Sequence, residues 1–573
     1  MGILGKSRRF KYLLTTFVAH LSFPAFIYAA DETTAPPDSN EAASQDWQQQ
    51  STGSPAPELV KQEDGSTKIE WHGGAVLDYH DNSVEAVSGR VRTPLSNGQF
   101  TNLQVQSDLR GTNAAGDVNY FQLGVTTTND RSILSQFSRQ INQVQIGRAG
   151  SGYLIAAGDV APNFSSLSSA LGVRGLIGQK QIGTTTFSGY TGYVVPSWEY
   201  LESRVPRTQL SRTAIGGKVE HTFDQKFTVY ATAQSLRDHA GTADFSGIDP
   251  TYIGTNSLGF QYTEGRYTLA GEAAVGRFSG DKQQNRRGYA EIIDGGWRGD
   301  VVSLRAGYHN IEAAFVSLSQ AAQPGIREAY VGGDWTAASW LNLGLDLRNS
   351  QGFTLAAPPF TSQKTDTDSG SLRANINFGV NHPGWALALL ENMSHSRDPN
   401  DFSTRNEQSS AALSYANASW NSGIAYALEH VRSQASPLTD SDTGTWQGNI
   451  GRRFSNEDSL TPASWTIGTN LSYTLQQQSL LTGLDLRASN IAFSINANRN
   501  NWGNINFVIS RGTNSRPSGL PSLNVDSVQV DASHQIGTKG SIKLYARQAR
   551  RNVIEPAIGS IEKLVGLTLG YTF

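Results

Sequence analysis

Apolar and polar residues alternate one by one from about residue 67 to the end of this chain, and this period of two constrains the fold more than any other feature. In the stretch 338–349, ASWLNLGLDLRN, leucines at 341, 343, 345 and 347 alternate with asparagine, glycine, aspartate and arginine. Only a β-strand places successive residues on opposite faces at this spacing. The pattern recurs in 69–79, 372–380, 465–475, 491–497 and 565–573, and no convincing amphipathic helix interrupts it. The chain is therefore predicted to be all-β.

The spacing of these segments indicates a barrel. We count about 26 of them, with a range of about 24–28, roughly one every 19 or 20 residues. Tight breaks such as 263–265, 421–423 and 537–540 are interleaved with longer polar stretches at 236–252, 311–326, 350–370, 394–408 and 432–444. Strands joined alternately by short and long connections are typical of outer-membrane barrels. We predict a single large antiparallel transmembrane β-barrel over residues 67–573.

A soluble chain of tandem sandwiches or a propeller is the alternative fold. Sandwiches repeat at about 100 residues and propeller blades at about 40–50 residues, and neither repeat is visible. Tryptophans also favour lipid, because interface girdles place them in or beside strands. Nine of the eleven tryptophans have such positions: Trp71, Trp297, Trp335, Trp340, Trp385, Trp420, Trp446, Trp465 and Trp502.

The first 66 residues have a different composition. Residues 1–30 combine four basic residues, a mostly apolar run and small residues at 29 and 30, which is typical of a secretory signal peptide. Residues 31–66 carry eight acidic residues and one lysine and are rich in serine, glutamine and proline. We interpret them as a disordered periplasmic tail. A second interpretation, in which 31–66 binds a periplasmic partner, stays open.

The last strand carries a more specific pattern. Outward apolar residues recur at every second position up to the final aromatic residue: Val565, Leu567, Leu569, Tyr571 and Phe573. This pattern resembles the terminal strand of Gram-negative outer-membrane proteins. The resemblance implies location in the outer membrane of a Gram-negative bacterium and recognition of this strand by the barrel-assembly machinery. Outer-membrane lipid and lipopolysaccharide are then the surrounding partners.

A barrel of this size is wide. With strands about 4.8 Å apart and tilted by about 40°, the backbone cylinder is roughly 50 Å across. Such a lumen leaks unless a segment, loop or partner narrows it. The best internal candidate is 160–181, where the period of two fails, with Asp159 and Arg174 as candidate plug or constriction residues. The spacing of these two residues resembles, weakly, a stretch in pilus ushers, which are export barrels with an internal plug. A long extracellular loop is the alternative.

Charged residues in the strands are expected to face the lumen, because a charge facing lipid costs about 2–4 kcal/mol at mid-depth. Asp346, Arg348 and Arg373 are the main candidates, and Glu70 and Asp78 follow the same rule. Their mixed signs predict no strong ion preference, and salt-bridged ladders are an interpretation equal to solute binding. Three arginine pairs near strand ends, at 286–287, 452–453 and 550–551, are candidates for contact with anionic lipid headgroups or lipopolysaccharide.

Little in the sequence points to catalysis. The chain contains no cysteine, so disulfides, thiolate metal sites and cysteine nucleophiles are excluded. Its histidines form no zinc motif, and no serine-hydrolase elbow is present. His395 between two serines is a remote phospholipase candidate. A formal net charge of −3 gives no reason to expect nucleic acid. We therefore predict no catalytic residues, metal or cofactor, and no enzyme activity.

The predicted function follows from the width. We expect a porin-like or secretion channel, a wide gated passage for a bulky solute or polymer such as a polysaccharide or protein. The alternative is a non-conducting barrel that anchors extracellular loops for interaction with a partner.

Overall fold

The computed structural model describes residues 68–573 apart from 89–96, 135–137, 163, 169–171, 196–197, 203–209, 241, 243–249, 281–284, 319–323, 355–362, 380–381, 435–439, 456–464, 481–484, 500–501, 516–521 and 554–557. The predicted signal peptide (1–30) and tail (31–66) lie outside the described residues. Within the described residues no helix is long and apolar enough to cross a membrane.

Twenty-six strands and one short helical turn make up this part of the chain. The strands are β1 (Lys68–Ser88), β2 (Gly98–Thr112), β3 (Val118–Thr128), β4 (Arg139–Gly150), β5 (Tyr153–Val160), β6 (Val173–Ile182), β7 (Thr185–Tyr193), β8 (Ser211–Phe223), β9 (Phe227–His239), β10 (Thr251–Glu264), β11 (Tyr267–Gly280), β12 (Arg286–Arg298), β13 (Val302–Ile311), β14 (Ile326–Ala338), β15 (Leu341–Thr354), β16 (Gln363–Asn377), β17 (Trp385–Arg397), β18 (Ser403–Ala416), β19 (Trp420–Ser433), β20 (Ser441–Ser455), β21 (Trp465–Leu480), β22 (Asp485–Arg499), β23 (Gly503–Ser515), β24 (Leu523–Ile536), β25 (Gly540–Val553) and β26 (Ile558–Thr572). The turn is α3 (Glu199–Glu202), between β7 and β8.

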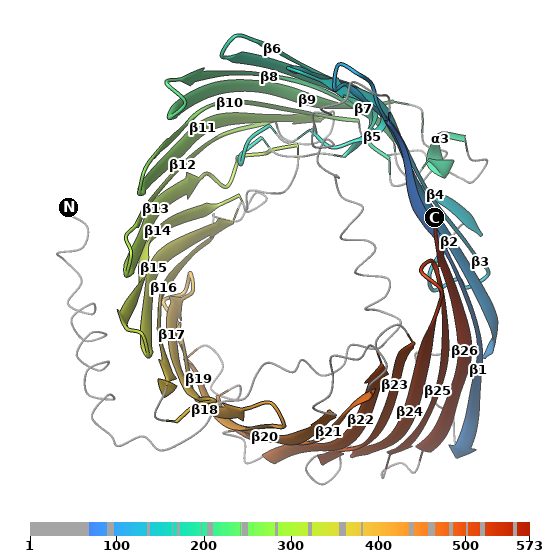
Figure 1. The fold of residues 1–573 in the computed structure, drawn as a ribbon. Coiled ribbons are helices and arrows are strands. Elements are labelled where there is room, and N and C mark those ends of the chain that lie inside the picture. Colours follow the sequence, from blue (N-terminus) through green and yellow to red (C-terminus); the bar gives the residue numbers. More distant parts are fainter. Residues whose placement is uncertain are drawn as a thin grey trace.

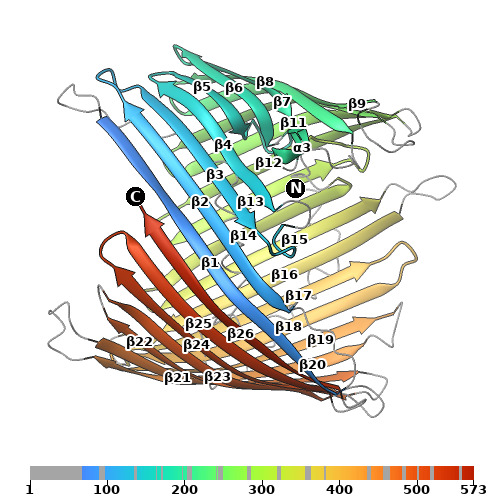
Figure 2. The same cartoon turned by 90° about the vertical axis from the view of Figure 1, so that its right-hand side faces the viewer.

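The strands form one closed antiparallel barrel. Each strand pairs with the next along the chain, and β26 pairs with β1. Figure 1 shows the ring of strands seen along its opening, and Figure 2 shows their tilt from the side. Closure leaves no unpaired sheet edge, which a barrel needs in hydrocarbon. The predicted fold class is confirmed, with 26 strands in a single barrel.

The two ends of the barrel differ. Connections from an even to the following odd strand are mostly short, and those from an odd to the following even strand are mostly long. We call these ends the short-turn end and the long-loop end; β1 begins and β26 ends at the short-turn end. Several predicted long connections are in fact strand: most of 350–370 lies in β15 and β16, and much of 394–408 in β17 and β18. The prediction of loops there is wrong because these strands continue beyond their apolar stretches, and their polar ends lack the alternation that marks a strand.

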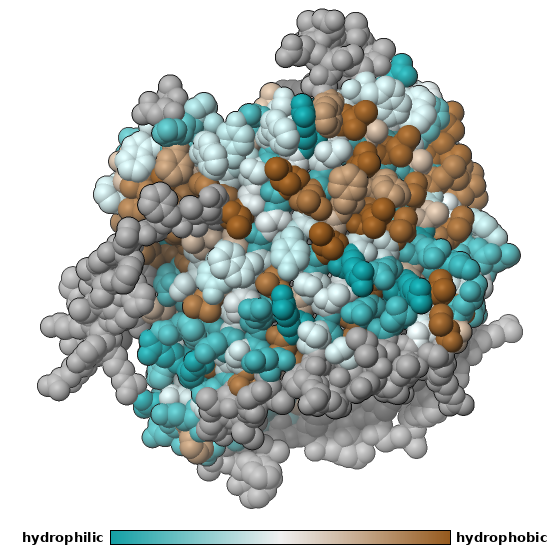
Figure 3. All heavy atoms as spheres, turned by 90° about the horizontal axis from the view of Figure 1, so that it is seen from below, coloured by the Kyte–Doolittle hydropathy of each residue, from teal (hydrophilic) through white to brown (hydrophobic). Residues whose placement is uncertain are grey.

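The outer face carries the apolar half of the alternation. Leu345 is 40% exposed, Leu258 67% and Ile155 61%, as expected for side chains that meet acyl chains rather than a protein core. Figure 3 shows an apolar zone beside a hydrophilic zone on one such face. Tryptophans concentrate at or near the short-turn end: Trp71, Trp297, Trp335, Trp340, Trp385, Trp420, Trp465 and Trp502. This arrangement is a one-sided interface girdle.

Candidate functional site

The inner wall between β13 and β16 carries charged residues that pair with each other. The predicted lumen residues Asp346, Arg348 and Arg373 lie on the inner face, opposite to the outward Leu345 and Leu347 of β15. Arg373 contacts Asp334 at 2.6 Å and Asp346 at 3.8 Å. The charge pairs along this wall are Asp346–Arg305, Asp334–Arg373 and Glu328–Arg348. One pair joins adjacent strands and the other two reach across one intervening strand, so opposite charges neutralise this part of the lumen. The arrangement is a salt-bridged ladder rather than a set of isolated charges.

A segment after β5 leaves the wall and packs against its inner face. Phe164 is 4% exposed and meets the ring of Tyr190 at 5.4 Å, edge to face, beside Val160 and Val173. Leu167 is 1% exposed and lies in a second apolar cluster with residues of β11, β12 and β13. We call the described residues of 161–168 the first infolded segment. Of the predicted occluding segment 160–181, residues 173–181 belong to β6 in the wall, and the part within 161–168 folds inward.

A second segment, residues 312–318 after β13, folds against the same region. Phe315 is 2% exposed and shares a cluster with Leu167, Ala274 and Ala290. The buried hydroxyl of Thr255 donates a hydrogen bond of 3.2 Å to the carbonyl oxygen of Val316. The sequence places this stretch in a long connection and gives no sign that it turns inward. We call 312–318 the second infolded segment; together the two segments thicken one side of the barrel, over β5–β13.

Two glycines make room for the second infolded segment. Gly276 of β11 and Gly288 of β12 lie directly opposite each other on the inner face. A Cβ on Gly276 would lie 2.2 Å from the carbonyl oxygen of Val316, and one on Gly288 would lie 2.2 Å from the nitrogen of Phe315. Backbone atoms cannot yield at such distances, so any larger residue displaces the segment. The glycine pair is thus a furrow that seats Phe315 and Val316.

One buried carboxylate holds the first infolded segment to the wall. Glu272 of β11 is 4% exposed. It accepts hydrogen bonds from Ser165 Oγ at 2.5 Å, from the backbone nitrogen of Leu167 at 3.1 Å and from Tyr230 Oη at 3.3 Å. Three donors compensate for removing this carboxylate from water. Sequence reasoning missed Glu272; an acid at an inward position of the small-residue strand AGEAAVG is the signal that points to it.

The candidate plug residues Asp159 and Arg174 lie elsewhere. They are opposite each other on β5 and β6, with Arg174 Nε 3.1 Å from Asp159 Oδ1. Their neighbours Val160 and Val173 face inward, so by alternation this pair faces outward, like Ile155. Trp198, next to α3, donates from Nε1 to Asp159 Oδ2 at 2.7 Å. The pair therefore fastens the β7–β8 connection to the strands at the long-loop end.

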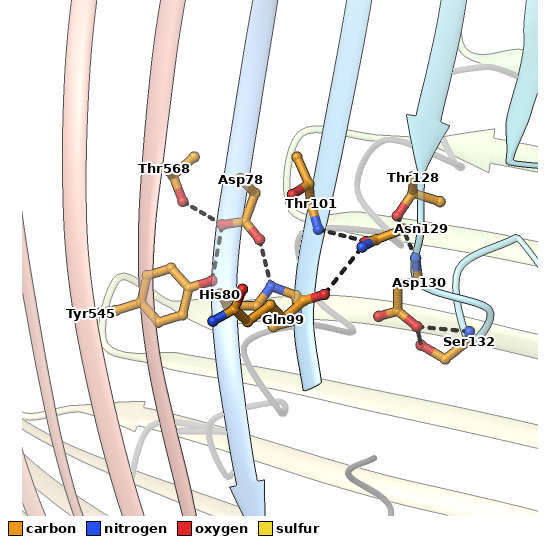
Figure 4. Close-up of polar contacts among 10 residues, drawn as sticks. All are labelled: Asp78, His80, Gln99, Thr101, Thr128, Asn129, Asp130, Ser132, Tyr545 and Thr568. Carbon is orange, nitrogen blue, oxygen red and sulfur yellow. Dashed lines mark hydrogen bonds and ion pairs between the residues drawn. The ribbon is translucent and has the colours of Figure 1, made fainter. Parts of the chain in front are cut away.

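Inward polar residues also cross the closing seam of the barrel. Asp78 of β1 accepts hydrogen bonds from Tyr545 Oη of β25 at 2.9 Å and from Thr568 Oγ1 of β26 at 2.7 Å, and it lies 2.9 Å from His80 Nδ1 (Figure 4). Beside the seam, where β2 meets the end of β3, Asn129 accepts a hydrogen bond from the backbone nitrogen of Thr101 (Figure 4). Three strands from the two ends of the sequence thus meet at one carboxylate.

The terminal-strand residues occupy the outer face of β26. Val565, Leu569 and Tyr571 are 60%, 39% and 52% exposed, and Leu567 lies on the same face by alternation. Phe573 follows the strand, and its ring lies 4.6 Å from that of Trp71. Its backbone nitrogen and oxygen each bond to Gly73 at 3.1 Å, so pairing continues to the last residue.

The remaining candidate residues, which are adjacent in the sequence, point to opposite faces of the barrel wall. His395 faces outward, opposite Asp368 and Arg405, whereas Ser394 and Ser396 face inward. The two arginines of each pair likewise point to opposite sides: Arg287, Arg452 and Arg550 outward, and Arg286, Arg453 and Arg551 inward. In the described part of the chain, no group of three or more histidines and acids is arranged to hold a metal ion.

Comparisons with known proteins give only distant matches, all of them among solved structures. No protein-family model matches the sequence, and no curated protein matches it. Solved structures with similar folds include OmpT of Vibrio cholerae (12% identity, 51% of this chain and 90% of that chain, TM-score 0.29), OmpF of Salmonella typhi in complex with daunomycin (14%, 50% and 92%, 0.28) and a triple mutant of the Rhodopseudomonas blastica porin (13%, 49% and 94%, 0.24). At these scores none of them bears on how this barrel works. By its own strand order and outer surface, this chain is a closed outer-membrane β-barrel.

Proposed function

We propose that this barrel is a gated passage for a bulky solute or polymer, narrowed by the two infolded segments. The observation that supports this most is the width of the barrel, because 26 strands close into one cylinder. Barrels of 16–18 strands already leave a water channel, and barrels of about 22 strands usually hold a plug. A small solute needs no cylinder of roughly 50 Å.

The inner surface supports the same proposal. Polar residues line the wall, and the charges of β13–β16 are paired within it. Apart from Glu312, whose backbone nitrogen bonds to Tyr289 of β12, the infolded segments rest on the wall through side chains and two glycines rather than through strand pairing, which allows them to leave. When the segments leave the wall or return to it, the width of the lumen changes, and gating requires such a change.

Conductance of the purified full chain in planar bilayers tests the proposal. We expect small or rare openings for the wild type and larger, longer openings for Gly276→Val/Gly288→Val, which evicts the second infolded segment. Gly512→Val is the matched control, because an added Cβ there lies 3.8 Å from its nearest neighbour atom. Silence of both the wild type and the double variant, with both properly folded, would instead support a non-conducting barrel that anchors surface loops.

A further inference from the structure

The inner wall opposite the infolded segments has a different chemistry. Strands β17–β23 expose mainly asparagine, glutamine, serine and threonine to the lumen. By the register of these strands, Glu429 and Arg453 are the only charged side chains among their described inward positions. The lumen therefore has a neutral side and a charged side.

Asparagines concentrate at the inward positions of β15–β23 nearest the short turns, so their row begins beside the charged wall and continues along the neutral wall. We call them the asparagine arc: Asn342, Asn375, Asn377, Asn421, Asn449, Asn470, Asn496, Asn498, Asn504 and Asn506. Three pairs are directly opposite on neighbouring strands: Asn342 with Asn375, Asn496 with Asn506, and Asn498 with Asn504. Two hollows of about 520 Å³ and 700 Å³ adjoin at Asn421 and follow the arc around the mouth.

Most amides of the arc are free to bond to the lumen contents. In the described structure, only Asn377 and Asn504 bond through their side chains to other protein groups, Gly379 and Ser533 respectively. The Oδ1 atom of Asn470 is shielded by the protein and has no partner in the described residues. An amide offers two donors and one acceptor oxygen. The arc is thus a row of unused, uncharged donors and acceptors.

This arrangement selects by charge and by hydrogen bonding. A polyanion or polycation gains nothing from neutral amides and gives up hydration of its charges beside them. As a hydroxyl-rich, uncharged polymer moves along the arc, its hydroxyl groups exchange hydrogen bonds with water for equivalent hydrogen bonds with the amides. The two hollows along the arc are also lined by the aromatic residues Trp340, Tyr415 and Trp420, which offer a sugar ring apolar surface beside the amides.

We infer that the asparagine arc receives an uncharged, hydroxyl-rich polymer, a neutral polysaccharide, at the short-turn mouth of the lumen. This inference rests on the proposed passage and gives its substrate class. The polymer meets the free amides of β19–β23 and moves along the neutral wall, on the side away from the infolded segments.

Blocking of single-channel current tests the inference. A linear dextran added on the short-turn side should interrupt the current at least about ten times more often than an alginate of equal length. Asn496→Leu/Asn506→Leu should lower the frequency of dextran blocks about tenfold. The double substitution removes two amides that have no protein partner in the described residues and replaces them with apolar side chains of similar size. The control is Asn392→Leu/Gln408→Leu, whose amides bond to each other at 3.3 Å, and it should stay within about twofold.

Other outcomes overturn the inference. Equal blocking by alginate, stronger blocking by an unfolded polypeptide such as reduced casein, or an unchanged dextran response in the Asn496/Asn506 variant would each do so. Heat-modifiable migration on gels checks that each variant is folded. If the wild type conducts no current, the proposed passage fails. Equilibrium binding of labelled dextran to the detergent-solubilised full chain, with the same variants, then decides the inference separately.

Discussion

Asp78 accepts a hydrogen bond of 2.9 Å from the hydroxyl of Tyr545, a residue 467 positions away in the sequence. The same carboxylate accepts from Thr568, so β1, β25 and β26 are joined on the inner face of the seam. Asp78→Ala should destabilise closure by about 1–3 kcal/mol, because two partly buried donors lose an ionised acceptor. The temperature at which the folded band disappears on semi-native gels measures this loss. Asp526→Ala, an outward acid on β24, is the control and should leave that temperature nearly unchanged.

Glu272 should determine whether the first infolded segment stays on the wall. Ser165 donates to Oε1 of Glu272 and Leu167 to Oε2, so the NH₂ group of Glu272→Gln faces one of these two donors and at least one bond is lost. Because the chain has no cysteine, Leu167→Cys provides a single label site that is shielded in the seated segment. We expect maleimide labelling of Cys at this position to accelerate about tenfold with Glu272→Gln.

Glu291→Gln is the matched control for that experiment. Glu291 lies on the adjacent strand but on the outer face, where it accepts from Asn310. An equal acceleration in both variants would show that loss of any strand carboxylate loosens the segment, and the assigned role of Glu272 would be wrong.

Outward arginines at the long-loop end should contact anionic lipid. Arg287 and Arg550 are exposed and face outward near the long loops, whereas Arg453 faces the lumen. Arg287→Ala/Arg550→Ala should lower the affinity of the solubilised barrel for lipopolysaccharide about 30-fold, since each of the two surface charges contributes about 1 kcal/mol. Arg453→Ala should not. An affinity unaffected by added salt would contradict an electrostatic contact.

Substitutions at Phe573 and Trp71 can distinguish a role in barrel assembly from a role in barrel stability. Its ring packs on Trp71 and its backbone pairs with Gly73. If the assembly machinery reads this residue, Phe573→Ala should lower the amount of barrel inserted in cells several-fold while leaving detergent refolding nearly intact. Trp71→Ala removes the same ring contact without altering the terminal residue. A similar loss for Trp71→Ala in cells would indicate that packing, not recognition, is what Phe573 supplies.

The barrel could be predicted from the sequence because each strand shows the alternation of apolar and polar residues by itself. Leu341, Leu343, Leu345 and Leu347 meet lipid, and their alternation with polar residues needs no knowledge of neighbours. The same rule fails near the long-loop end. There Asn349, Asp368 and His395 face outward into polar surroundings, so both faces of the strand are polar and the period disappears although the strand continues.

The infolded segments depended on contacts that no local pattern contains. Gly276 and Gly288 resemble any other strand glycines until Phe315 is known to lie over them. Loss of periodicity near 160–181 indicated that something departs from the wall, but not which residues return to it. Asp159 and Arg174 adjoin that irregularity in the sequence, but alternation places their side chains on the outside of the barrel.

The second infolded segment lies in its glycine furrow without adding a rung to the sheet: beyond Glu312, its attachment to β10 runs through the Thr255 hydroxyl. Its departure would therefore break no pairing between strands. The barrel would keep its circumference while its bore widens, so opening would not deform the surrounding bilayer, and membrane thickness or tension should have little influence on the opening rate.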